Sequence, residues 1–598
     1  MSRCGILSLV FIVLFNFNLA FTDSGSSLEL EPISISKSKA HLLNSYTLES
    51  DSINNSPFDS WIEALNSLPL DLQSRTAKAD IQTDFSLRGS SFQGVLMLLD
   101  GSRINDPQTA HHNADIPLTK EDIERIDVLG GISSALFGPD AIGGAINIIT
   151  KKPETKKMVL ELSGGQHEMK SGLISISDKI DNLGVRLSLE KQESNGFSYD
   201  TDFKKFTSRF DSCLDMPEGE FNLGLGYQEK EFGAYDFYTP ALGYPSKEWT
   251  KTVLINTGLR LDKGDFIIKP NFLWRRHYDK FMLDKTGKRS TYLGHHRTDI
   301  FTPNIYFQKE NDIFGNLGLG LEYGQERINS ASLGKHTRGH KSIFMDTDKE
   351  LNSRLSLGLS FRGDDFDGFN QVYTGSLNLQ FLYSLAHSFS LGLARSVRIP
   401  SFTELYYNDP TTRGDSSLSA EKSLNYQIGY GYKQEFFSAG LIYFFREEDD
   451  MIDWIKRTPY QVKWQAENIT EDEVLGWESY FKVKINPHIN FDTTYTYINK
   501  SIDSKGYLYK YGQNYAKYLV NNTLKFNLPF GVQTISGIYK KKPGRRGWFL
   551  LDAYLSYNLN KNFHIFSRAT NLLNVEYQEI EGIPQPGRWV EAGLRVEW

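Results

Sequence analysis

A polar run from Asn105 to Asn113 holds the side chains best suited to bind another molecule. Amides, imidazoles and a carboxylate can donate or accept hydrogen bonds along the polar rim of a ligand. His111 and His112 are adjacent, and adjacent side chains of an extended chain point apart, so the pair is poorly placed to share one metal ion. Ligand binding by hydrogen bonds and plain loop packing both remain open. The candidate ligand-binding residues of the run are Asn105, Asp106, Gln108, Thr109, His111, His112 and Asn113.

A second group with metal-binding chemistry is the acidic stretch Glu447 to Asp450. Carboxylate oxygens are the ligands that calcium prefers, although a solvated loop end has the same composition. The motifs Gly-x-Ser-x-Gly, the Walker loop and His-Glu-x-x-His do not occur, and the glycines of Leu317 to Leu321 belong to an alternating strand pattern. We therefore expect neither an enzyme nor a cofactor, although a triad assembled from distant residues stays open as an alternative.

The composition argues against a helical membrane bundle and against nucleic acid as a partner. The chain has 598 residues, 39% of them hydrophobic, a mean hydropathy of −0.41 and a net charge of −7. Acidic and basic residues are mixed without a basic stripe, so no nucleic acid is expected. Aromatic residues make up 13% of the chain and glycines number 49. This suits many short strands with aromatic girdles at two membrane interfaces.

The one long apolar run, Gly5 to Leu19, follows Arg3 and precedes Ala20. This pattern predicts a secretory signal peptide over residues 1–20, with cleavage near Ala20. A membrane anchor is the alternative, but a spanning helix needs about 20 apolar residues and the run has about 15. Because Cys4 would leave with the signal peptide, Cys213 would be the only remaining cysteine and no disulfide is expected.

Two segments that differ in composition and in residue pattern follow the signal peptide. Residues 21–50 are rich in Ser, Asn and Lys and show no sustained amphipathic period, so we interpret them as a flexible arm. Within residues 51–152, a helix is predicted over Phe58–Leu65, and the apolar strand Val95–Leu99 enters a tight turn. The second segment is therefore predicted to be a small mixed α/β domain.

Residues 153–598 show alternation of apolar and polar side chains to the end of the chain, as in Val185, Leu187 and Leu189. Period two marks half-buried strands, and about 20 residues per strand and loop gives about 22 strands. The turn at Asn486–His488 is very short, whereas other connections are long. Short turns at one end and long loops at the other predict an all-β, transmembrane antiparallel β-barrel. The long connections are Phe232–Lys247 and Tyr406–Ser419.

The last strand supports a membrane location. It ends on Trp598, with apolar residues alternating with Glu591, Arg595 and Glu597. A basic residue at the lipid midplane costs about 2–4 kcal/mol, so the charged side chains are predicted to face the lumen and Trp598 the lipid. The alternative is that Trp598 is the last core residue of a soluble sheet.

Several blocks of the chain follow one another in an order that is hard to obtain by chance. Those of residues 51–152 are Phe85–Gly89, Val95–Asp106, Ile123–Leu129, Ser134–Gly138 and Ala141–Thr150, and those of residues 153–598 are Arg398–Tyr406, Leu418–Ser423, Asn571–Asn574 and Pro586–Trp589. In this order the blocks resemble the TonB-dependent outer-membrane receptors, and the resemblance covers nearly the whole exported chain. Two departures from the family pattern are Gly130–Ile132, where the family has Arg-Gly-Pro, and Phe137, where it has Tyr; they put plug-to-barrel contacts of those side chains in doubt.

The resemblance implies that residues 51–152 plug the lumen of a barrel formed by residues 153–598. A barrel of this size would leak without a plug. It also implies a monomer among outer-membrane lipids, energised by the periplasm-spanning TonB protein. That partner would grip an extended segment by strand addition, for which Leu30–Ser36 is the candidate; an ordinary disordered tail is the alternative. The candidate TonB-box residues are Glu31, Pro32, Ile33, Ser34 and Ile35.

The resemblance further places the polar run 105–113 at the outward apex of the plug. Together with Tyr235, Phe237 and Tyr238, and with the stretch His295–Asp299, the run looks most like the cobalamin-receptor branch. The implied ligand is a corrinoid, with an iron chelate as the alternative for the same architecture. A passive porin and an outer-membrane enzyme are the alternatives of other classes.

Three charged residues of the plug, Arg88, Glu124 and Arg125, lie among apolar strand residues. An unpaired charge in such surroundings is costly. We therefore expect these side chains to form ion pairs with one another or with the barrel wall.

Overall fold

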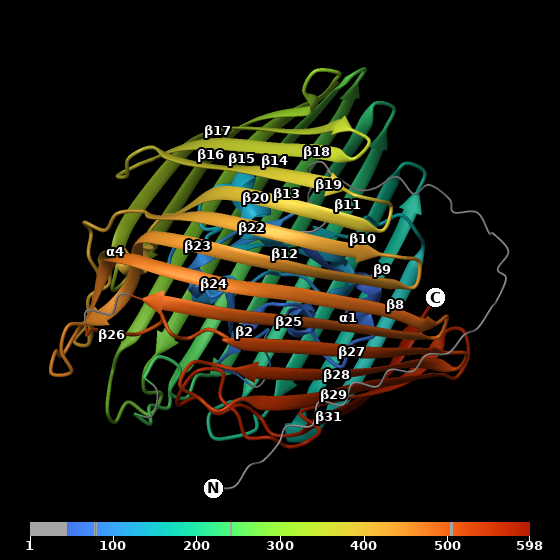
Figure 1. Cartoon of the computed structure of the whole chain (residues 1–598). Helices are drawn as coiled ribbons and strands as arrows, with labels where there is room; N and C mark the ends of the chain where they lie inside the picture. Colours follow the sequence, from blue (N-terminus) through green and yellow to red (C-terminus); the bar gives the residue numbers. More distant parts are fainter. Residues whose placement is uncertain (1–44, 77, 79, 240–241, 503–505) are drawn as a thin grey trace, which may run out of the picture. The chain divides into compact units, whose positions relative to one another are not determined.

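The computed structural model describes residues 45–598 apart from 77, 79, 240–241 and 503–505 (Figure 1). The predicted signal peptide, most of the predicted arm and the candidate TonB-box residues lie outside this part of the chain. Within it, no helix combines the length and apolar character that a membrane span requires.

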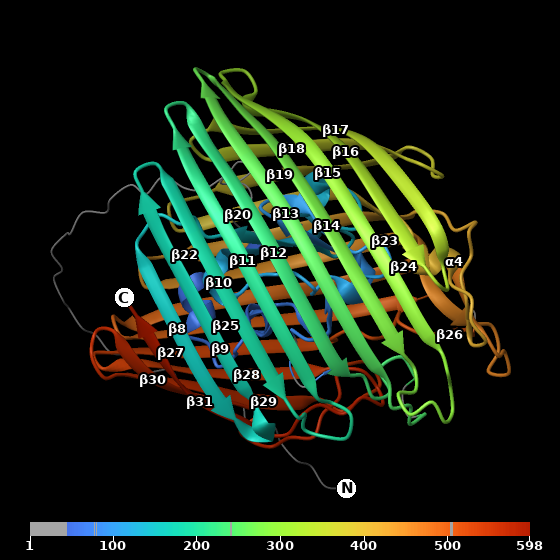
Figure 2. The same cartoon turned by 180° about the vertical axis from the view of Figure 1, so that it is seen from behind.

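The described residues after the plug form a closed barrel of 22 antiparallel strands, so the predicted fold class and strand number are confirmed. The last strand pairs with the first, and Figure 2 shows the early strands side by side. Two further segments are short: β21 (Thr412–Arg413) pairs with β24, and β26 (Leu508–Tyr509) pairs with β23. The barrel strands are β8 (Lys157–Gly165), β9 (Lys170–Ile180), β10 (Leu183–Ser194), β11 (Phe203–Met216), β12 (Gly219–Gly233), β13 (Lys247–Lys263), β14 (Phe266–Met282), β15 (Leu293–Asn311), β16 (Gly315–Ser330), β17 (Gly334–Asn352), β18 (Leu355–Phe366), β19 (Val372–Leu382), β20 (His387–Arg398), β22 (Glu421–Lys433), β23 (Phe437–Lys456), β24 (Trp464–Asn486), β25 (Ile489–Ile502), β27 (Tyr518–Leu528), β28 (Gly531–Lys541), β29 (Trp548–Asn558), β30 (Phe563–Thr570) and β31 (Trp589–Glu597).

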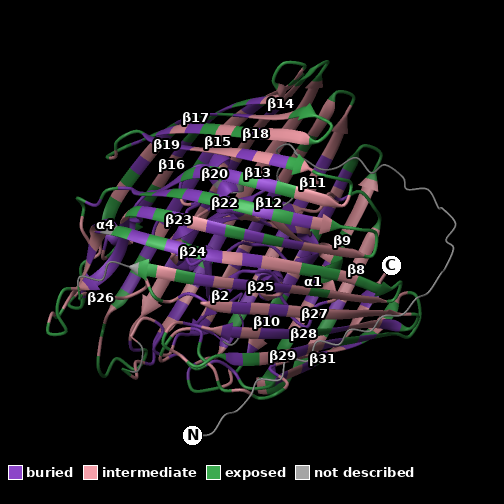
Figure 3. Ribbon diagram, in the orientation of Figure 1, coloured by how far each residue is buried: buried purple, intermediate pink, exposed green. Residues whose placement is uncertain are grey.

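The wall is apolar outside and polar inside, the reverse of a soluble protein. Along β22, Tyr426 and Ile428 are exposed whereas Asn425 and Gln427 are buried towards the lumen. Figure 3 shows this alternation of exposed and buried residues along many strands. Trp598 is also exposed. Since lipid surrounds the outer face of a membrane barrel, the exposed apolar band is where the strands meet the bilayer.

The two ends of the barrel differ in their connections. At the end that holds the C-terminus, the strands are joined by turns of two to four residues. At the opposite end the connections reach 22 residues, over 399–420, which include α4 (Phe402–Tyr406). We call these the short-turn end and the long-loop end. Because outer-membrane barrels have short periplasmic turns and long outer loops, the long-loop end faces the cell exterior.

The plug is a five-stranded sheet with short helices, ordered β1-β6-β7-β4-β5, beside a small β2–β3 hairpin. Strands β4 and β7 run parallel and the other pairs antiparallel. Its apolar core continues into Leu254 and Leu273 of the wall. The plug elements are β1 (Ser45–Glu49), α1 (Ser50–Asn54), α2 (Trp61–Ala64), η2 (Leu65–Ser67), β2 (Asp71–Ser74), β3 (Thr83–Ser86), η3 (Phe92–Gly94), β4 (Val95–Leu99), β5 (Ser102–Arg103), η4 (Ala110–His112), η5 (Lys120–Asp122), β6 (Ile123–Gly130), α3 (Gly131–Ser134), η6 (Ala135–Phe137) and β7 (Gly144–Thr150).

Two sequence-based boundaries in this region are wrong. Ser45–Glu49, predicted as arm, form β1 and pair with β6 through the register Ser45↔Leu129 to Glu49↔Arg125. The alternation of only five residues was too short to stand out from the polar arm. The helix predicted from Phe58 begins at Trp61, because the Ser60 side chain accepts a hydrogen bond from the Glu63 amide and caps it there.

A glycine at the start of β7 is required by the plug sheet. Gly144 has φ +146°, and a Cβ there would lie 2.2 Å from the Leu129 carbonyl oxygen. We expect Gly144→Ala to destabilise the plug by about 1–3 kcal/mol, because β6 and β7 must separate. Faster amide hydrogen exchange in these two strands would be the measurement. Gly164→Ala, whose added Cβ meets only ordinary contact distances, is the control; unchanged exchange in Gly144→Ala would contradict the prediction.

Candidate functional site

The polar run 105–113 is packed inside the lumen, so the expectation of an open binding loop needs correction. Apart from half-buried Asn105, its candidate residues are buried. Asp106 Oδ2 accepts hydrogen bonds from Arg275 Nη1 at 2.5 Å and Thr298 Oγ1 at 3.0 Å. Both partners come from the barrel wall. The run therefore reaches the wall, and its polar groups are largely used within the protein.

The amides of the run hold its own conformation. Asn105 Oδ1 accepts from the Met97 amide at 2.7 Å. Asn113 Oδ1 accepts from the Asp106 amide at 2.8 Å, and the Gln108 amide donates to Asp106 Oδ1 at 2.9 Å. The Thr109 carbonyl accepts from the His112 amide at 3.3 Å, and the Gln108 carbonyl accepts from the Thr403 amide at 3.1 Å. These contacts fit the loop-packing interpretation that the sequence left open.

The two histidines turn to opposite sides, as their adjacency predicts. His111 Nδ1 donates to Asp84 at 2.7 Å, and its ring stacks on Phe92 with centroids 4.3 Å apart. Burial lowers the pKa of His111 to about 4, so the ring is neutral at pH 7. Burial opposes ionisation of Asp84, but Arg75 at 2.6 Å and His111 lower the pKa of this carboxyl to about 2. His112 instead faces the wall, 3.5 Å from Asp279.

The predicted aromatic loop folds inward over the plug. Phe237 is buried in a cluster with Phe203 and Trp589, and Tyr235 contacts Tyr199 edge to face. The Tyr238 hydroxyl accepts a 2.7 Å hydrogen bond from Gln82, and its ring lies 5.8 Å from that of His111. Of the predicted ligand residues, the structure thus brings Tyr238 and His111 together at the plug surface.

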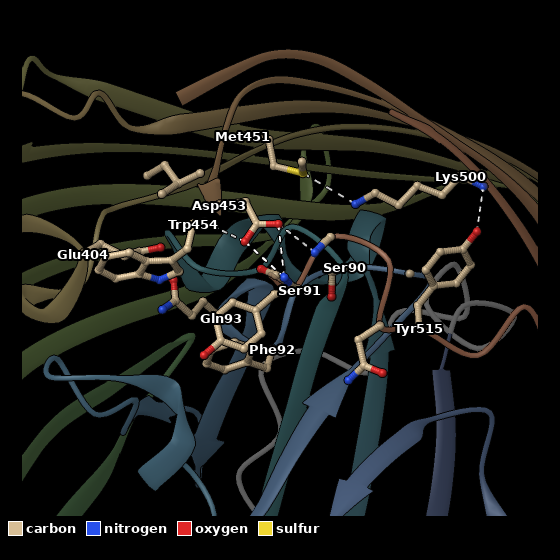
Figure 4. A pocket seen from close by; sticks show the side chains of 15 residues that line it. Ser90, Ser91, Phe92, Gln93, Glu404, Met451, Asp453, Trp454, Lys500 and Tyr515 are labelled. Atoms are coloured by element: carbon tan, nitrogen blue, oxygen red, sulfur yellow. Dashed lines mark hydrogen bonds between the residues drawn. The ribbon is translucent and has the colours of Figure 1, made fainter. Parts of the chain in front are cut away.

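A pocket lies beside this pair, between the plug and the wall (Figure 4). Phe92 joins the two regions, because it stacks on His111 and lies 5.1 Å from the Tyr511 ring. The lining residues come from the plug loop after β3, from α4, and from β23, β25 and the connection after β26. They are Gly89, Ser90, Ser91, Phe92, Gln93, Glu404, Met451, Ile452, Asp453, Trp454, Lys500, Tyr511, Gly512, Asn514 and Tyr515.

One carboxylate fixes the outer wall of the pocket. Asp453 accepts backbone hydrogen bonds from Gly512 and Trp454, both at 2.7 Å, and from Tyr511 at 3.2 Å. These bonds hold the connection after β26 against the end of β23 (Figure 4). The aromatic rings of Trp454 and Tyr511 are thereby placed on the pocket by the fold.

The pocket offers rings and amides but little free positive charge. Lys500 is the only cation among the described lining residues, and its ammonium group binds Asp472 at 2.5 Å. Glu404 is likewise paired, with Arg398 at 2.9 Å. An arrangement of this kind suits a ligand that stacks on aromatic rings and exchanges neutral hydrogen bonds.

Sequence reasoning missed this pocket, and it misread the acidic stretch. A tyrosine-rich segment, with Tyr507, Tyr509, Tyr511 and Tyr515, was the available signal. Residues 447–450 are neither a loop end nor a cluster, because they alternate along β23. Glu448 is buried and pairs with Arg446 at 2.6 Å. The calcium interpretation therefore has no geometric support.

The three plug charges do not pair with one another. Arg88 reaches the wall, with Nη2 2.8 Å from Glu478 Oε2, whereas Arg125 pairs with Asp127 of its own strand at 3.1 Å. Glu124 has no ion pair among the described residues. Of these three residues, Arg88 alone forms an ion pair with the barrel wall, which corrects the expectation for Glu124 and Arg125.

Comparison with known protein families gives two matches in chain order. The family described as TonB-dependent Receptor Plug Domain matches residues 40–145, and that described as TonB dependent receptor-like, beta-barrel matches residues 175–572. Vitamin B12 transporter BtuB of Vibrio vulnificus is 23% identical over 556 residues, covering 86% of this chain and 85% of that protein. The iron-regulated outer membrane virulence protein of Vibrio cholerae is 22% identical, with 74% of each chain covered.

Solved structures share the architecture at lower identity. The siderophore receptor PirA from Acinetobacter baumannii has a TM-score of 0.78 at 14% identity, covering 94% of this chain and all of that one (100%). The FrpB iron transporter from Neisseria meningitidis also has a TM-score of 0.78, at 13% identity, with 93% and 99% covered. These likenesses establish the fold. With a plug and a 22-stranded barrel that both match the family in order, the chain belongs to the TonB-dependent outer-membrane receptors.

Proposed function

We propose that this TonB-dependent receptor binds a corrinoid at the long-loop end and imports it into the periplasm. The observation that carries the ligand choice is the pocket beside Phe92, with its aromatic rings, amides and internally paired Lys500. A corrinoid presents a flat conjugated ring edged with neutral amides, which matches stacking and amide hydrogen bonding. Sequence relatives that are vitamin B12 transporters support the same choice.

An iron chelate is the second candidate, because the structural neighbours include siderophore receptors. Ferric catecholates carry several negative charges, and their recognition calls for unpaired cations. Lys500 of the pocket, and Arg398 beside the lining residue Glu404, are held by carboxylates of the protein. On the basis of this electrostatic mismatch we rank the chelate second.

A porin or an enzyme has less support. The plug packs against the wall inside the lumen, through an apolar core that both share, which opposes passive flow. Three of the four relatives named above are described as transporters or receptors. We further propose that the chain acts as a monomer in outer-membrane lipid, with TonB as its periplasmic partner gripping Glu31–Ile35.

The ligand choice is tested by calorimetric titration of the folded protein with cyanocobalamin, beside a panel of ferric siderophores. Nanomolar affinity for cyanocobalamin with no siderophore binding is the expected result. Binding of an iron chelate alone would overturn the ligand choice and leave the transport assignment in place.

A variant of a pocket residue tests whether cyanocobalamin binds in this pocket. We expect Tyr511→Ser to weaken cyanocobalamin binding by about 5-fold to 30-fold, because loss of an aromatic contact costs about 1–2 kcal/mol. Titration of the variant is the measurement. Tyr460→Ser is the matched control, since Tyr460 is 95% exposed. Equal affinities for the Tyr511 variant and the control would show that the ligand binds elsewhere.

A further inference from the structure

Three metal-binding side chains meet where the plug touches the wall near η4. His112 and Asp115 belong to the plug, and His277 projects from β14; all three are buried. Asp115 Oδ2 lies 3.4 Å from His112 Nδ1 and 3.6 Å from His277 Nε2, and the three ligand atoms lie within 4.8 Å of one another. Tetrahedral zinc with ligands at about 2.0–2.2 Å needs similar separations. We propose that these residues bind a divalent transition-metal ion.

An unpartnered nitrogen points into this group. His277 Nε2 is buried and has no hydrogen-bond partner among the described residues, and the Asp115 Oδ2 atom lies 3.6 Å from it. Buried polar atoms are nearly always paired, so an unpaired one calls for an explanation such as a bound ion. A metal ion between His277 and Asp115 supplies the missing partner.

Each ligand also has the outer partner that metal sites use to orient their ligands. His112 Nε2 faces Asp279 Oδ2 at 3.5 Å, and His277 Nδ1 lies 2.9 Å from Thr252 Oγ1. The second oxygen of Asp115 accepts from Lys230 at 2.7 Å. Hydrogen bonds of this kind fix the ring orientation and the free nitrogen of a ligating histidine. The nitrogens left for a metal are His112 Nδ1 and His277 Nε2.

The charge balance of the surroundings favours a cation. Four buried carboxylates face two buried basic side chains, so the region carries an excess of two negative charges in the state in which all four carboxylates are ionised and the histidines, including nearby His296, are neutral. Burying uncompensated charge is expensive, and one divalent ion would neutralise it. The carboxylates are those of Asp106, Asp115, Glu248 and Asp279, and the basic groups are Lys230 and Arg275.

The donor set selects the class of metal. Two imidazoles and one carboxylate suit zinc, cobalt or nickel, whereas calcium prefers oxygen ligands alone. Three protein ligands leave a tetrahedral position open. Because His112 and Asp115 come from the plug and His277 from the wall, the ion clamps the plug to the barrel. This role is separate from the imported ligand, whose pocket uses other residues.

The zinc content of the refolded protein tests the proposal directly. The full mature chain, carrying a histidine-free tag, is refolded with zinc because the site is buried, and is then passed over chelating resin. We expect one tightly held zinc per chain by mass spectrometry, lost in His277→Gln and Asp115→Asn. Thr252→Val, which removes only the outer partner of His277, should weaken binding by about 10-fold or more. Cobalt loading should give visible absorption in the wild type and none in His277→Gln.

His340→Gln is the matched control, since His340 is a buried wall histidine beside Glu322 at 3.2 Å. It should keep the zinc. Zinc-free wild type after refolding with zinc would overturn the proposal, as would equal loss in His340→Gln and His277→Gln. If His277→Gln fails to fold, as judged by loss of heat-modifiable migration on a gel, unchanged zinc affinity in folded Thr252→Val would overturn it.

Discussion

Replacing Ile33 and Ser34 together with proline should abolish uptake while leaving ligand affinity unchanged. The physical reason lies in the proposed coupling, in which the TonB protein adds a strand to Leu30–Ser36 through backbone hydrogen bonds. Proline has no amide hydrogen and fixes φ, so two consecutive prolines remove a donor whichever residue faces the partner. Cellular uptake of radiolabelled cyanocobalamin and calorimetric affinity of the purified protein are the two measurements.

The matched control is Ile33→Val with Ser34→Ala, which changes the side chains and keeps both amides. It should transport at the wild-type rate. Transport by the double-proline variant, or by a deletion of residues 30–36, would remove the coupling assignment from this segment. Loss of affinity in the purified variant would show instead that the segment acts on the ligand site.

Removal of the Arg88 guanidinium should weaken the attachment of the plug to the barrel wall. Arg88 adopts a left-handed φ of 48° and directs its side chain at the wall, where Nε and Nη2 bind the two Glu478 oxygens at 3.1 and 2.8 Å. Nη1 binds Gln427 at 2.8 Å, and the guanidinium lies 4.7 Å from the Phe444 ring centroid. Arg88→Met leaves a buried carboxylate unpaired, which costs about 3–5 kcal/mol. We expect higher single-channel conductance in planar bilayers.

Two further variants separate the ion pair from general damage. Adding Glu478→Gln to Arg88→Met removes the unpaired charge. The conductance of the double variant should therefore return most of the way to the wild-type value. Lys170→Met breaks an exposed contact with Glu193 at 4.0 Å and should cost less than about 1 kcal/mol, with no change in conductance. Equal conductance of Arg88→Met and wild type would show that the plug is held without this pair.

The barrel was predictable because the alternation of apolar and polar residues is a local pattern that every strand repeats. Alternation in segments such as Val185–Leu189 marks a strand wherever it occurs, and 22 strands average out errors in any one boundary. The same reasoning placed the charges of the final strand in the lumen, where Arg595 pairs with Glu121 at 2.7 Å. It failed at Ser45–Glu49, because five residues at a sheet edge carry too little pattern to define β1.

The site was less predictable because it depends on residues distant in sequence. The pocket joins Phe92 to Tyr511 across more than 400 positions, and no local pattern reports such a contact. Composition identified the polar run 105–113 as a binding candidate, but its burial follows from wall residues such as Arg275, whose approach appears only in three dimensions. His112 shows the same limit, since its partner His277 lies on β14.

The place of β1 determines how tension would act on the plug. β1 is the edge strand of the plug sheet and the first described element after the arm, so a pull on the arm loads β1 before any other strand. Its pairing with β6 spans five residues, about 17 Å of extended chain. Separation of β1 from β6 lengthens the extended segment that precedes the plug, while the other four strands of the sheet keep their pairing. The plug can thus yield mechanically in a first step that is smaller than ejection of the whole domain.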